Sequence, residues 1–385
     1  MKSYRFLTPP TIYYGIGALE SSCDKLSDLG NRPLLVTDKV MTDIGYVNKL
    51  VNYLEKQKVA VSLFNEVNTE PTDHYIENGL HLFKENHCDF LIALGGGSPI
   101  DVAKAISIMV SNPGKIQDYM GLGKVQQEGP PIVAIPTTSG TGSEVTQFTI
   151  ITDTKNDIKM LIGSEYIVPK IAINDPILTI SVPPGITAAT GIDALTHAIE
   201  AYTSRRHQPL ADIFALSSIK RISKYLRRAW ANGDDKKARS EMMLAALEAG
   251  MAFNNSSVTI VHGMSRPLGA LFHIPHGISN AVLLPACLEY AIMGLPERFV
   301  DVAKAIGVCV NNLSDLDFAK EGVMQIKKLC EDIEIPSISG LGIDKNAFMK
   351  QLDKMASDAL ASCSPYNNAG KPSNEVIIKI YEQSF

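Results

Sequence analysis

The sequence predicts a doubly wound α/β domain followed by an all-helical domain. Its 385 residues exceed what one hydrophobic core usually organises. Over residues 1–180, short apolar runs alternate with amphipathic stretches, which is typical of a parallel sheet covered by helices. From residue 181 to residue 385 strand signals nearly vanish and helical periodicity dominates. We therefore place the domain boundary after residue 180.

The first half begins with an edge strand and continues with alternating elements. Residues 4–16 are rich in aromatic and β-branched side chains but contain Pro9 and Pro10, which favours an edge strand or hairpin. The expected helices then cover 17–29, 46–56, 74–85 and 100–111, and the expected strands cover 33–38, 59–64, 90–94 and 132–135. This order predicts right-handed βαβ units in a parallel sheet.

A proline-rich hinge around residues 174–185 leads into the helical half. Its helices are expected over residues 187–203, 209–230, 237–252, 256–267, 279–293, 296–306, 315–331 and 344–358. The net charge of −5 does not indicate nucleic acid or an anionic membrane as a partner. Six widely spaced cysteines without a CxxC pair favour reduced thiols in a cytoplasm, and no apolar run approaches the 18 residues of a membrane span.

Two loops rich in small and hydroxyl residues follow two of the expected strands. The first contains Gly95, Gly96, Gly97 and Ser98, and it opens a helix. The second contains Thr137, Thr138 and Thr141. Backbone N–H groups in a glycine loop at a helix N-terminus favour a diphosphate, although neither loop is a GxGxxG fingerprint and each alone is equally well a tight turn. Together they predict a dinucleotide lying across the sheet.

Asp38 ends the first buried strand and has two possible roles. A carboxylate there accepts hydrogen bonds from an adenosine ribose and repels a 2′-phosphate, which favours NAD over NADP. The other role is a helix N-cap, because Asp is among the preferred capping residues.

Four potential metal ligands lie in two stretches of the helical half. Asp193 and His197 are four residues apart on a predicted helix, so they project from the same face. His262 lies on a later helix, and His276 is expected in the loop that follows it. One carboxylate with three imidazoles suits Fe²⁺ or Zn²⁺ better than Mg²⁺ or Ca²⁺. We therefore predict a divalent metal centre, with the active site in the cleft between the two halves. Any one of these residues alone would more often be an ordinary helix-end or core residue.

Five motifs in this order resemble the iron-dependent (group III) alcohol dehydrogenases: GGGSPIDVAK, PTTSGTGSEVT, NDP, GIDALTHAIEAY and VHGMSRPLGALFHIPHG. The resemblance implies a Rossmann-like NAD(P) domain, a C-terminal helical bundle and one iron or zinc ion, as in the fold shared with dehydroquinate synthase. It also implies reversible hydride transfer between a nicotinamide and an alcohol/aldehyde pair, and a homodimer or a higher homo-oligomer. Pairing through the N-terminal edge strand would account for that dimer.

The resemblance also implies roles for individual residues. The metal ligands are Asp193, His197, His262 and His276, and Asp38 is the acid that selects NAD. The ribose and nicotinamide are lined by Thr146, Phe148, Ile150 and Lys159. Asp101 and Lys104 match the D-x-x-K after the glycine loop and are expected beside the cofactor; alternatively they are a surface i,i+3 pair.

One position departs from the family pattern. Arg266 stands where many members carry a second histidine near the metal, and an arginine is no general base near neutral pH. His273, or the cofactor ribose with solvent, would then have to act as the proton relay. A guanidinium one turn from His262 suits a short aldehyde with an anionic tail, with sulfoacetaldehyde as the first expectation, then phosphonoacetaldehyde or succinate semialdehyde. Alternatively Arg266 pairs with a local carboxylate or the cofactor phosphate.

Three other functions remain open at this stage. The substrate could be a neutral aldehyde or diol such as lactaldehyde or 1,3-propanediol. A lyase of the dehydroquinate synthase type would use NAD transiently, but its sugar-acid phosphate needs more Lys and Arg near the metal than residues 187–203 contain. A non-catalytic NAD-binding protein would not need the four metal ligands.

Overall fold

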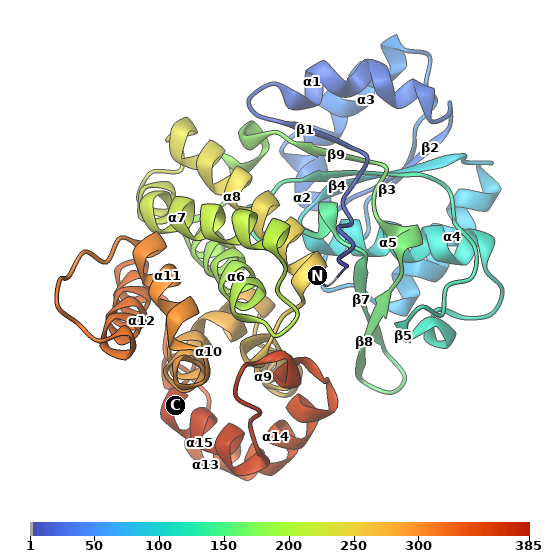
Figure 1. Cartoon of the computed structure of the whole chain (residues 1–385). Coiled ribbons are helices and arrows are strands. Elements are labelled where there is room, and N and C mark those ends of the chain that lie inside the picture. Colours follow the sequence, from blue (N-terminus) through green and yellow to red (C-terminus); the bar gives the residue numbers. More distant parts are fainter. Residues whose placement is uncertain (1–2) are drawn as a thin grey trace. The chain divides into compact units, whose positions relative to one another are not determined.

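The computed structural model describes residues 3–385, which form two compact units (Figure 1). One unit comprises residues 7–181, and the other comprises residues 182–385 together with the N-terminal segment that ends at Phe6. The Phe6 ring lies 5.8 Å from that of Phe214, and the Arg5 carbonyl accepts a hydrogen bond from Gln208. The start of the chain is thus anchored on the helical unit, although it was expected in the α/β domain.

The first unit is built on a six-stranded, wholly parallel sheet in the order β1-β9-β6-β4-β2-β3. The strands are β1 (Thr11–Tyr14), β2 (Pro33–Val36), β3 (Ser62–Phe64), β4 (Phe90–Gly95), β6 (Ile132–Pro136) and β9 (Ile171–Asn174). This confirms the predicted parallel sheet and the edge position of the first strand. Strand β9 was not predicted, because a four-residue apolar run is too short to show a period.

Helices cover both faces of this sheet. They are α1 (Ala18–Ser22), α2 (Lys39–Asp43), α3 (Tyr46–Lys56), α4 (Asp73–Glu85) and α5 (Gly97–Ser111). Along β4, Ile92 packs in a core with residues of α1 and α3, whereas Leu91 packs in a core with residues of α4 and α5. Alternate side chains of one strand therefore enter two separate cores.

A small three-stranded sheet in the order β5-β8-β7 lies beside α5 and was missed by the sequence analysis. Its strands are β5 (Gly121–Leu122), β7 (Phe148–Asp153) and β8 (Ile158–Gly163), and β7 and β8 form an antiparallel hairpin. Every second residue of β7 is buried. The buried positions are Thr149, Ile151 and Asp153, so apolar residues do not alternate along this strand and the sequence does not reveal the hairpin.

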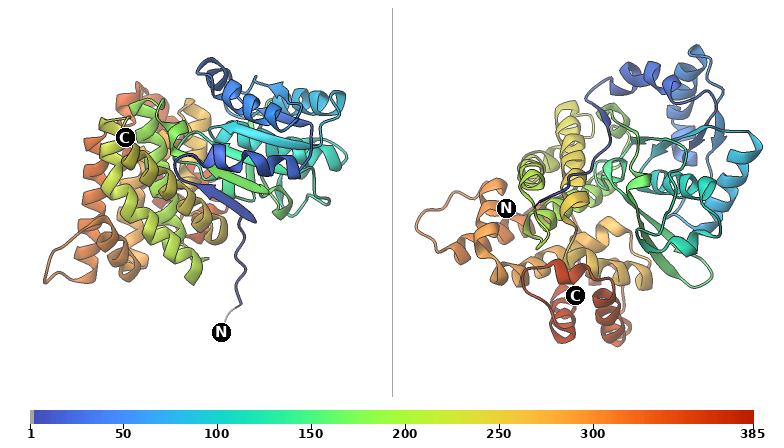
Figure 2. Two further views of the ribbon diagram at one scale, coloured as in Figure 1. Left: turned by 90° about the horizontal axis from the view of Figure 1, so that it is seen from above. Right: turned by 45° about the vertical axis from the view of Figure 1, so that its right-hand side comes forward.

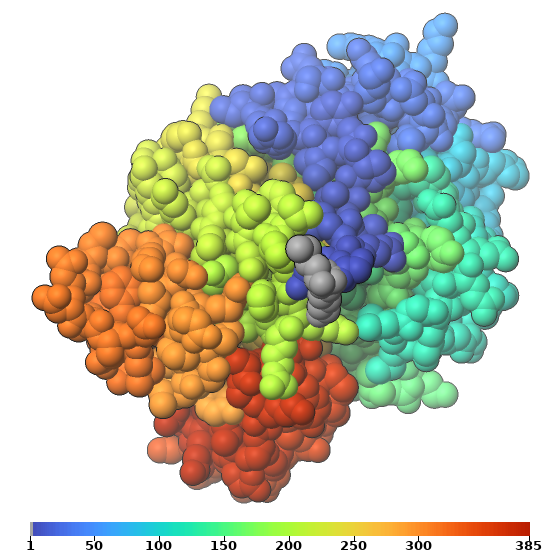
Figure 3. Space-filling view, in the orientation of Figure 1, coloured from blue at the N-terminus to red at the C-terminus, as the bar shows by residue number. Residues whose placement is uncertain are grey.

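The second unit is a bundle of helices, coloured from green to red in Figure 2. In it, α6 packs against α7, α8 and α10 and is buried along most of its length. Its helices are α6 (Pro184–Thr203), α7 (Pro209–Ala231), α8 (Lys236–Ser256), α9 (Ile260–Phe272), α10 (His276–Ala291), α11 (Pro296–Ile306), α12 (Asp315–Asp332), α13 (Lys345–Lys350), α14 (Leu352–Ala361) and α15 (Asn374–Ser384). The helices α13 to α15 form one continuous part of the surface (red in Figure 3).

Three expectations for the bundle were wrong. The helix expected over 256–267 is α9, which continues past Pro267 to Phe272. The helix expected over 279–293 begins earlier, at His276, so this histidine lies in the first turn of α10 rather than in a loop. The helix expected over 344–358 is divided at Gln351 into α13 and α14. Helix α15 was not predicted.

Residues 276–294 are long and apolar enough to cross a membrane by length and composition alone, which the sequence analysis had excluded. Half of this stretch is buried, and Leu283, Leu284 and Cys287 belong to the bundle core. These features are those of a core helix. All six cysteines are unpaired, as expected.

Candidate metal and cofactor sites

Helix α6 presents three buried polar side chains on one face. Asp193, His197 and Glu200 follow one another at i, i+4 and i+7, and they are 2%, 5% and 1% exposed. Pro184 at the first helical position and the apolar residues between the three keep this segment helical inside the core. A buried row of this kind requires partners for its charges.

His262 and His276 bring those partners from α9 and α10. The Asp193 Oδ1 atom lies 3.6 Å from His262 Nε2 and 3.7 Å from His276 Nε2. One ligand atom from each of the three residues lies within 4.8 Å of the other two. This spacing fits a single divalent ion held by one carboxylate and two imidazoles.

His197 borders this group without belonging to its closest three. Its ring stacks between Phe253, at 4.1 Å, and His262, at 4.4 Å, and its Nδ1 lies 3.9 Å from Asp193 Oδ2. That Nδ1 is buried and has no hydrogen-bond partner within residues 3–385. A buried imidazole nitrogen without a partner is destabilising unless something else binds there, so His197 fits a fourth ligand.

Glu200 is one residue of this site that was not predicted from the sequence. Its Oε2 accepts from His262 Nδ1 over 2.5 Å, which leaves His262 Nε2 facing Asp193. Its Oε1 accepts from Thr259 Oγ1 and from the Val261 backbone N–H at the start of α9. A carboxylate behind a ligating histidine fixes the orientation of the ring. Its spacing of seven residues from Asp193 was the available signal.

The pKa values follow from burial and these pairings. Burial alone would raise the pKa of Asp193, but the imidazoles of His197, His276 and His262 outweigh it and hold that pKa well below its ordinary range. Burial lowers the pKa of His197 to about 3, so its ring is neutral at pH 7. For His262 the effect of burial is outweighed by Glu200 and Asp193, which raise the pKa.

Arg266 lies on α9 one turn after His262. Its Nη1 donates to Ser364 Oγ over 3.3 Å, and its Nε is buried without a partner. No carboxylate of the described chain lies within 4.0 Å of its guanidinium, so the local ion pair considered as an alternative is not formed. His273 ends α9 with a left-handed φ of 53° and an exposed side chain, a placement that gives the relay role no support.

In the α/β unit, the predicted cofactor loops come together. The Thr137 N–H donates to the Gly95 carbonyl over 2.9 Å. A Cβ on Gly97 would lie 2.9 Å from Thr141 Cγ2, and one on Gly96 would lie 3.7 Å from Thr138 Cγ2. A side chain at Gly97 would therefore clash with the second loop, whereas one at Gly96 would only touch it. Ser98 lies in the first turn of α5, where the helix N-terminus favours an anion.

Asp38 caps a helix and faces the glycine loop. Its Oδ1 accepts from the Met41 N–H over 2.8 Å and so caps the short helix α2. A Cβ on Gly95 would lie 3.3 Å from its Oδ2. The capping role is confirmed for one carboxylate oxygen, while the other is placed beside the predicted diphosphate loop.

Asp101 and Lys104 are not a surface pair. Asp101 accepts from Ser143 Oγ over 2.6 Å and from the Ile150 N–H over 2.9 Å. Lys104 is fully buried, and its Nζ donates to Ser143, to Thr146 Oγ1 and to the Phe148 carbonyl. The pair therefore ties α5 to the loop and strand that follow β6.

The remaining predicted lining residues share one face of the hairpin. Phe148 and Ile150 alternate with the buried residues of β7, and Lys159 lies opposite Thr152 in the antiparallel register, on that same face. Lys159 Nζ lies 2.6 Å from Glu70 Oε2. Thr146 is the exception, because its buried hydroxyl contacts Lys104.

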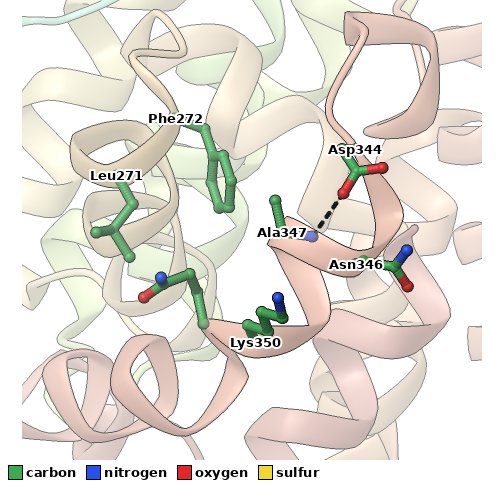
Figure 4. Close-up of a pocket in the computed structure, with 7 residues that line it drawn as sticks. Leu271, Phe272, Asp344, Asn346, Ala347 and Lys350 are labelled. Atoms are coloured by element: carbon green, nitrogen blue, oxygen red, sulfur yellow. Dashed lines mark hydrogen bonds between the residues drawn. The ribbon is translucent and has the colours of Figure 1, made fainter.

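A hollow of about 330 Å³ lies elsewhere in the bundle, between the end of α9 and α13 (Figure 4). Phe272 and Lys350 line it, and Asp344 is used to cap α13 through the Ala347 N–H. None of the candidate metal ligands lines this hollow.

Comparison with known proteins places this geometry in a family. Residues 9–176 match the model described as iron-containing alcohol dehydrogenase, and residues 187–385 match the C-terminal domain model of the Fe-containing alcohol dehydrogenase family. The 1,3-propanediol dehydrogenase of Klebsiella pneumoniae is 39% identical over all of both chains.

Solved structures give the same result. A 1,3-propanediol oxidoreductase structure superimposes with a TM-score of 0.96 at 38% identity over the full length of both chains. The sulfoacetaldehyde reductase of Bifidobacterium kashiwanohense, solved with NAD⁺, gives a TM-score of 0.87 at 31% identity, covering 100% of this chain and 99% of that one.

Proposed function

The chain belongs to the iron-containing alcohol dehydrogenase family, and from this premise we propose that it is a metal-dependent, NAD(H)-linked enzyme that interconverts a short primary alcohol and its aldehyde. The family implies a divalent metal and a nicotinamide cofactor. The observation that carries the proposal is the group of Asp193 and His262, which are buried, with the partly exposed His276, beside a His197 nitrogen that has no partner among the described residues.

We assign the metal to Asp193, His197, His262 and His276. Asp193 stays ionised because the surrounding imidazoles hold its pKa low, and Glu200 fixes the ring of His262. When bound, the ion supplies Lewis-acid chemistry toward an alcohol or carbonyl oxygen, and the nicotinamide supplies hydride transfer. The donor set accepts both Fe²⁺ and Zn²⁺, and we propose iron because the family is named for it.

The cofactor is assigned to the α/β unit. The loops at residues 95–98 and 137–141 offer backbone N–H groups and small side chains to a diphosphate, and Asp38 stands beside them as an acceptor for a ribose. Phe148, Ile150 and Lys159 present one face of the hairpin to the rest of the cofactor. Asp101, with both oxygens engaged by the protein, supports this surface rather than contacting the cofactor.

Removal of the metal tests the proposal. Chelated protein should lose aldehyde-dependent NADH oxidation, and Fe²⁺ or Zn²⁺ should restore it. A lyase of the dehydroquinate synthase type would consume no net NADH, so a one-to-one loss of NADH with aldehyde separates the two. Full activity after complete chelation would contradict the proposal.

We further propose that the substrate carries an anionic tail, with sulfoacetaldehyde first. The supporting observation is Arg266, a guanidinium one turn from His262 with an unpartnered Nε and no carboxylate among residues 3–385 within ion-pair distance. The competing candidate is the 1,3-propanediol/3-hydroxypropanal pair, which the 39% identity to a 1,3-propanediol dehydrogenase favours.

A substrate comparison decides between these candidates. The ratio of kcat/KM for sulfoacetaldehyde to that for 3-hydroxypropanal should fall at least tenfold in Arg266→Ala, because a charge-assisted bidentate contact is lost. An unchanged ratio would leave the neutral diol as the substrate.

We also propose a cytoplasmic homodimer. Strand β1 pairs only with β9 within residues 3–385, so its other edge is available to a second copy. Tyr14 at its end and Ile16 just after it are exposed. Unpaired cysteines suit a reducing compartment. Light scattering should give twice the mass of 41.8 kDa.

A further inference from the structure

Asn280 lies at the centre of the candidate ligand group, although it is not one of the predicted ligands. Its Nδ2 donates to Asp193 Oδ1 over 2.6 Å. The same nitrogen lies 3.1 Å from His262 Nε2 and 3.2 Å from His276 Nε2. One amide group therefore contacts three of the four proposed ligands, which come from three different helices.

The position of Asn280 shows that these contacts are not incidental to packing. It lies on α10 one turn after His276, and its side chain is fully buried. Its Oδ1 is buried and has no hydrogen-bond partner in the described part of the chain. A leucine of similar shape would fill the space without leaving a polar atom unsatisfied. The N–H groups are thus the part of this side chain that the site uses.

We propose that Asn280 is a positioning residue of the metal centre, an inference that rests on the metal-dependent function proposed above. Its two N–H groups gather Asp193, His262 and His276 before an ion arrives. The two imidazole nitrogens would hold the ion and so lose their contacts with Asn280, whereas the Asp193 carboxylate has enough lone pairs to keep accepting from Asn280. Asn280 therefore reduces the ordering that metal binding requires.

The test measures metal affinity rather than turnover. Chelated wild type, Asn280→Ala and Asn280→Leu are titrated with Zn²⁺ and Co²⁺ against a chromophoric chelator, and the visible spectrum of bound Co²⁺ reports the ligand geometry. Both variants should bind either ion at least tenfold more weakly, with a changed Co²⁺ spectrum. Asn280→Leu keeps the side-chain volume, so it provides folded protein if the alanine variant is unstable.

Ser279→Ala is the matched control. Ser279 is the neighbouring, fully buried residue of α10, and its hydroxyl contacts the Ile274 carbonyl rather than a ligand. Its metal affinity should stay within twofold of wild type. Equal or tighter binding by both Asn280 variants would overturn the proposal, because the amide would then be a spectator or a competitor of the ion. If wild type itself binds neither ion, the proposed metal enzyme fails, which is a distinguishable result.

Discussion

Single residues in this chain combine two duties, and Asp38 is the clearest case. One of its oxygens caps α2 through the Met41 N–H, and the other faces the glycine loop near Gly95. An aspartate directly after a strand can either cap the next helix or bind a ribose, so the sequence alone does not decide between these two roles. The structure shows that the two uses are compatible, since they involve different oxygens.

The two duties of Asp38 can be separated by Asp38→Ser. Serine caps helices almost as well as aspartate but carries no charge to repel a 2′-phosphate. We expect the thermal midpoint to change little, while the ratio of kcat/KM for NADPH to that for NADH rises tenfold or more. Measuring both coenzymes at a fixed aldehyde concentration checks this. Asp38→Ala is the control that loses the cap as well, and an unaltered coenzyme ratio in both variants would remove the ribose role.

Lys104 gives a prediction about pH. Burial lowers its pKa to about 8, from about 10.5 when it is exposed. Between these values the unfolded chain binds a proton that the folded chain does not, so the contribution of Lys104 to stability rises with pH. Below pH 8 both states are protonated and the contribution is constant.

The measurement compares wild type with Lys104→Met. At pH 7 the variant should be less stable by about 3 kcal/mol, because Asp101 and the Phe148 carbonyl lose a buried partner. The difference in unfolding free energy should grow from pH 8 to pH 10, by at most about 1.4 kcal/mol per pH unit. Cysteines and tyrosines titrate in both proteins, so their contributions to the unfolding free energy cancel in this difference. Lys155→Met, at an exposed position, should show neither effect.

At the scale of elements, periodicity predicted most helices and the core strands, and it failed where the period was short or broken. The bounds of α3 and α11 were predicted to the residue because both are amphipathic. Strand β9 and the hairpin β7–β8 were not predicted, because strands of four to six residues carry little periodic signal. A helix was expected to end at Pro267, but α9 continues through this residue.

The same distinction applies to the candidate site. The four candidate ligands could be proposed from the sequence because Asp193 and His197 lie at helical spacing and two further histidines follow them in the chain. Asn280 and Glu200 were not singled out, because a buried amide or a helical glutamate has many ordinary uses and only the fold brings these two to the ligands. That Lys104 is buried could also not be predicted, because its burial depends on residues distant in the sequence that the fold brings around it.

The packing of α10 on α6 sets the position of His276. A Cβ on Gly277 would lie 2.7 Å from the Ala189 carbonyl oxygen, which is backbone and cannot rotate away. Gly277→Ala should therefore push the first turn of α10 from α6 and displace the neighbouring imidazole. We expect a loss of about 1–3 kcal/mol in stability and at least tenfold weaker Zn²⁺ binding.

Gly185→Ala is the control for this substitution. Nothing lies within 4 Å of the Cβ that it adds near the start of α6. It should leave Zn²⁺ affinity unchanged and stabilise the protein slightly, because alanine loses less conformational freedom on folding. Normal metal binding by Gly277→Ala would mean that this contact between the helices does not fix the site.

At the scale of the whole molecule, the two units have separate hydrophobic cores. The strands of the α/β unit pack in two clusters with α1 to α5, and the bundle has a cluster of its own. The proposed metal ligands all lie in the bundle, whereas the proposed diphosphate loops all lie in the α/β unit. A bound metal ion should therefore stabilise mainly the bundle, and bound NAD⁺ should stabilise mainly the α/β unit.

Hydrogen exchange read by mass spectrometry tests this division. Zn²⁺ added to chelated protein should slow exchange in peptides from α6, α9 and the first turns of α10, where it restrains Asp193, His262 and His276. NAD⁺ added to the same protein should slow exchange around residues 95–101 and 137–146, where backbone N–H groups are offered to the diphosphate. If Zn²⁺ alone protected the loops after β4 and β6 as strongly as it protects α6, the two units would instead open as one cooperative body.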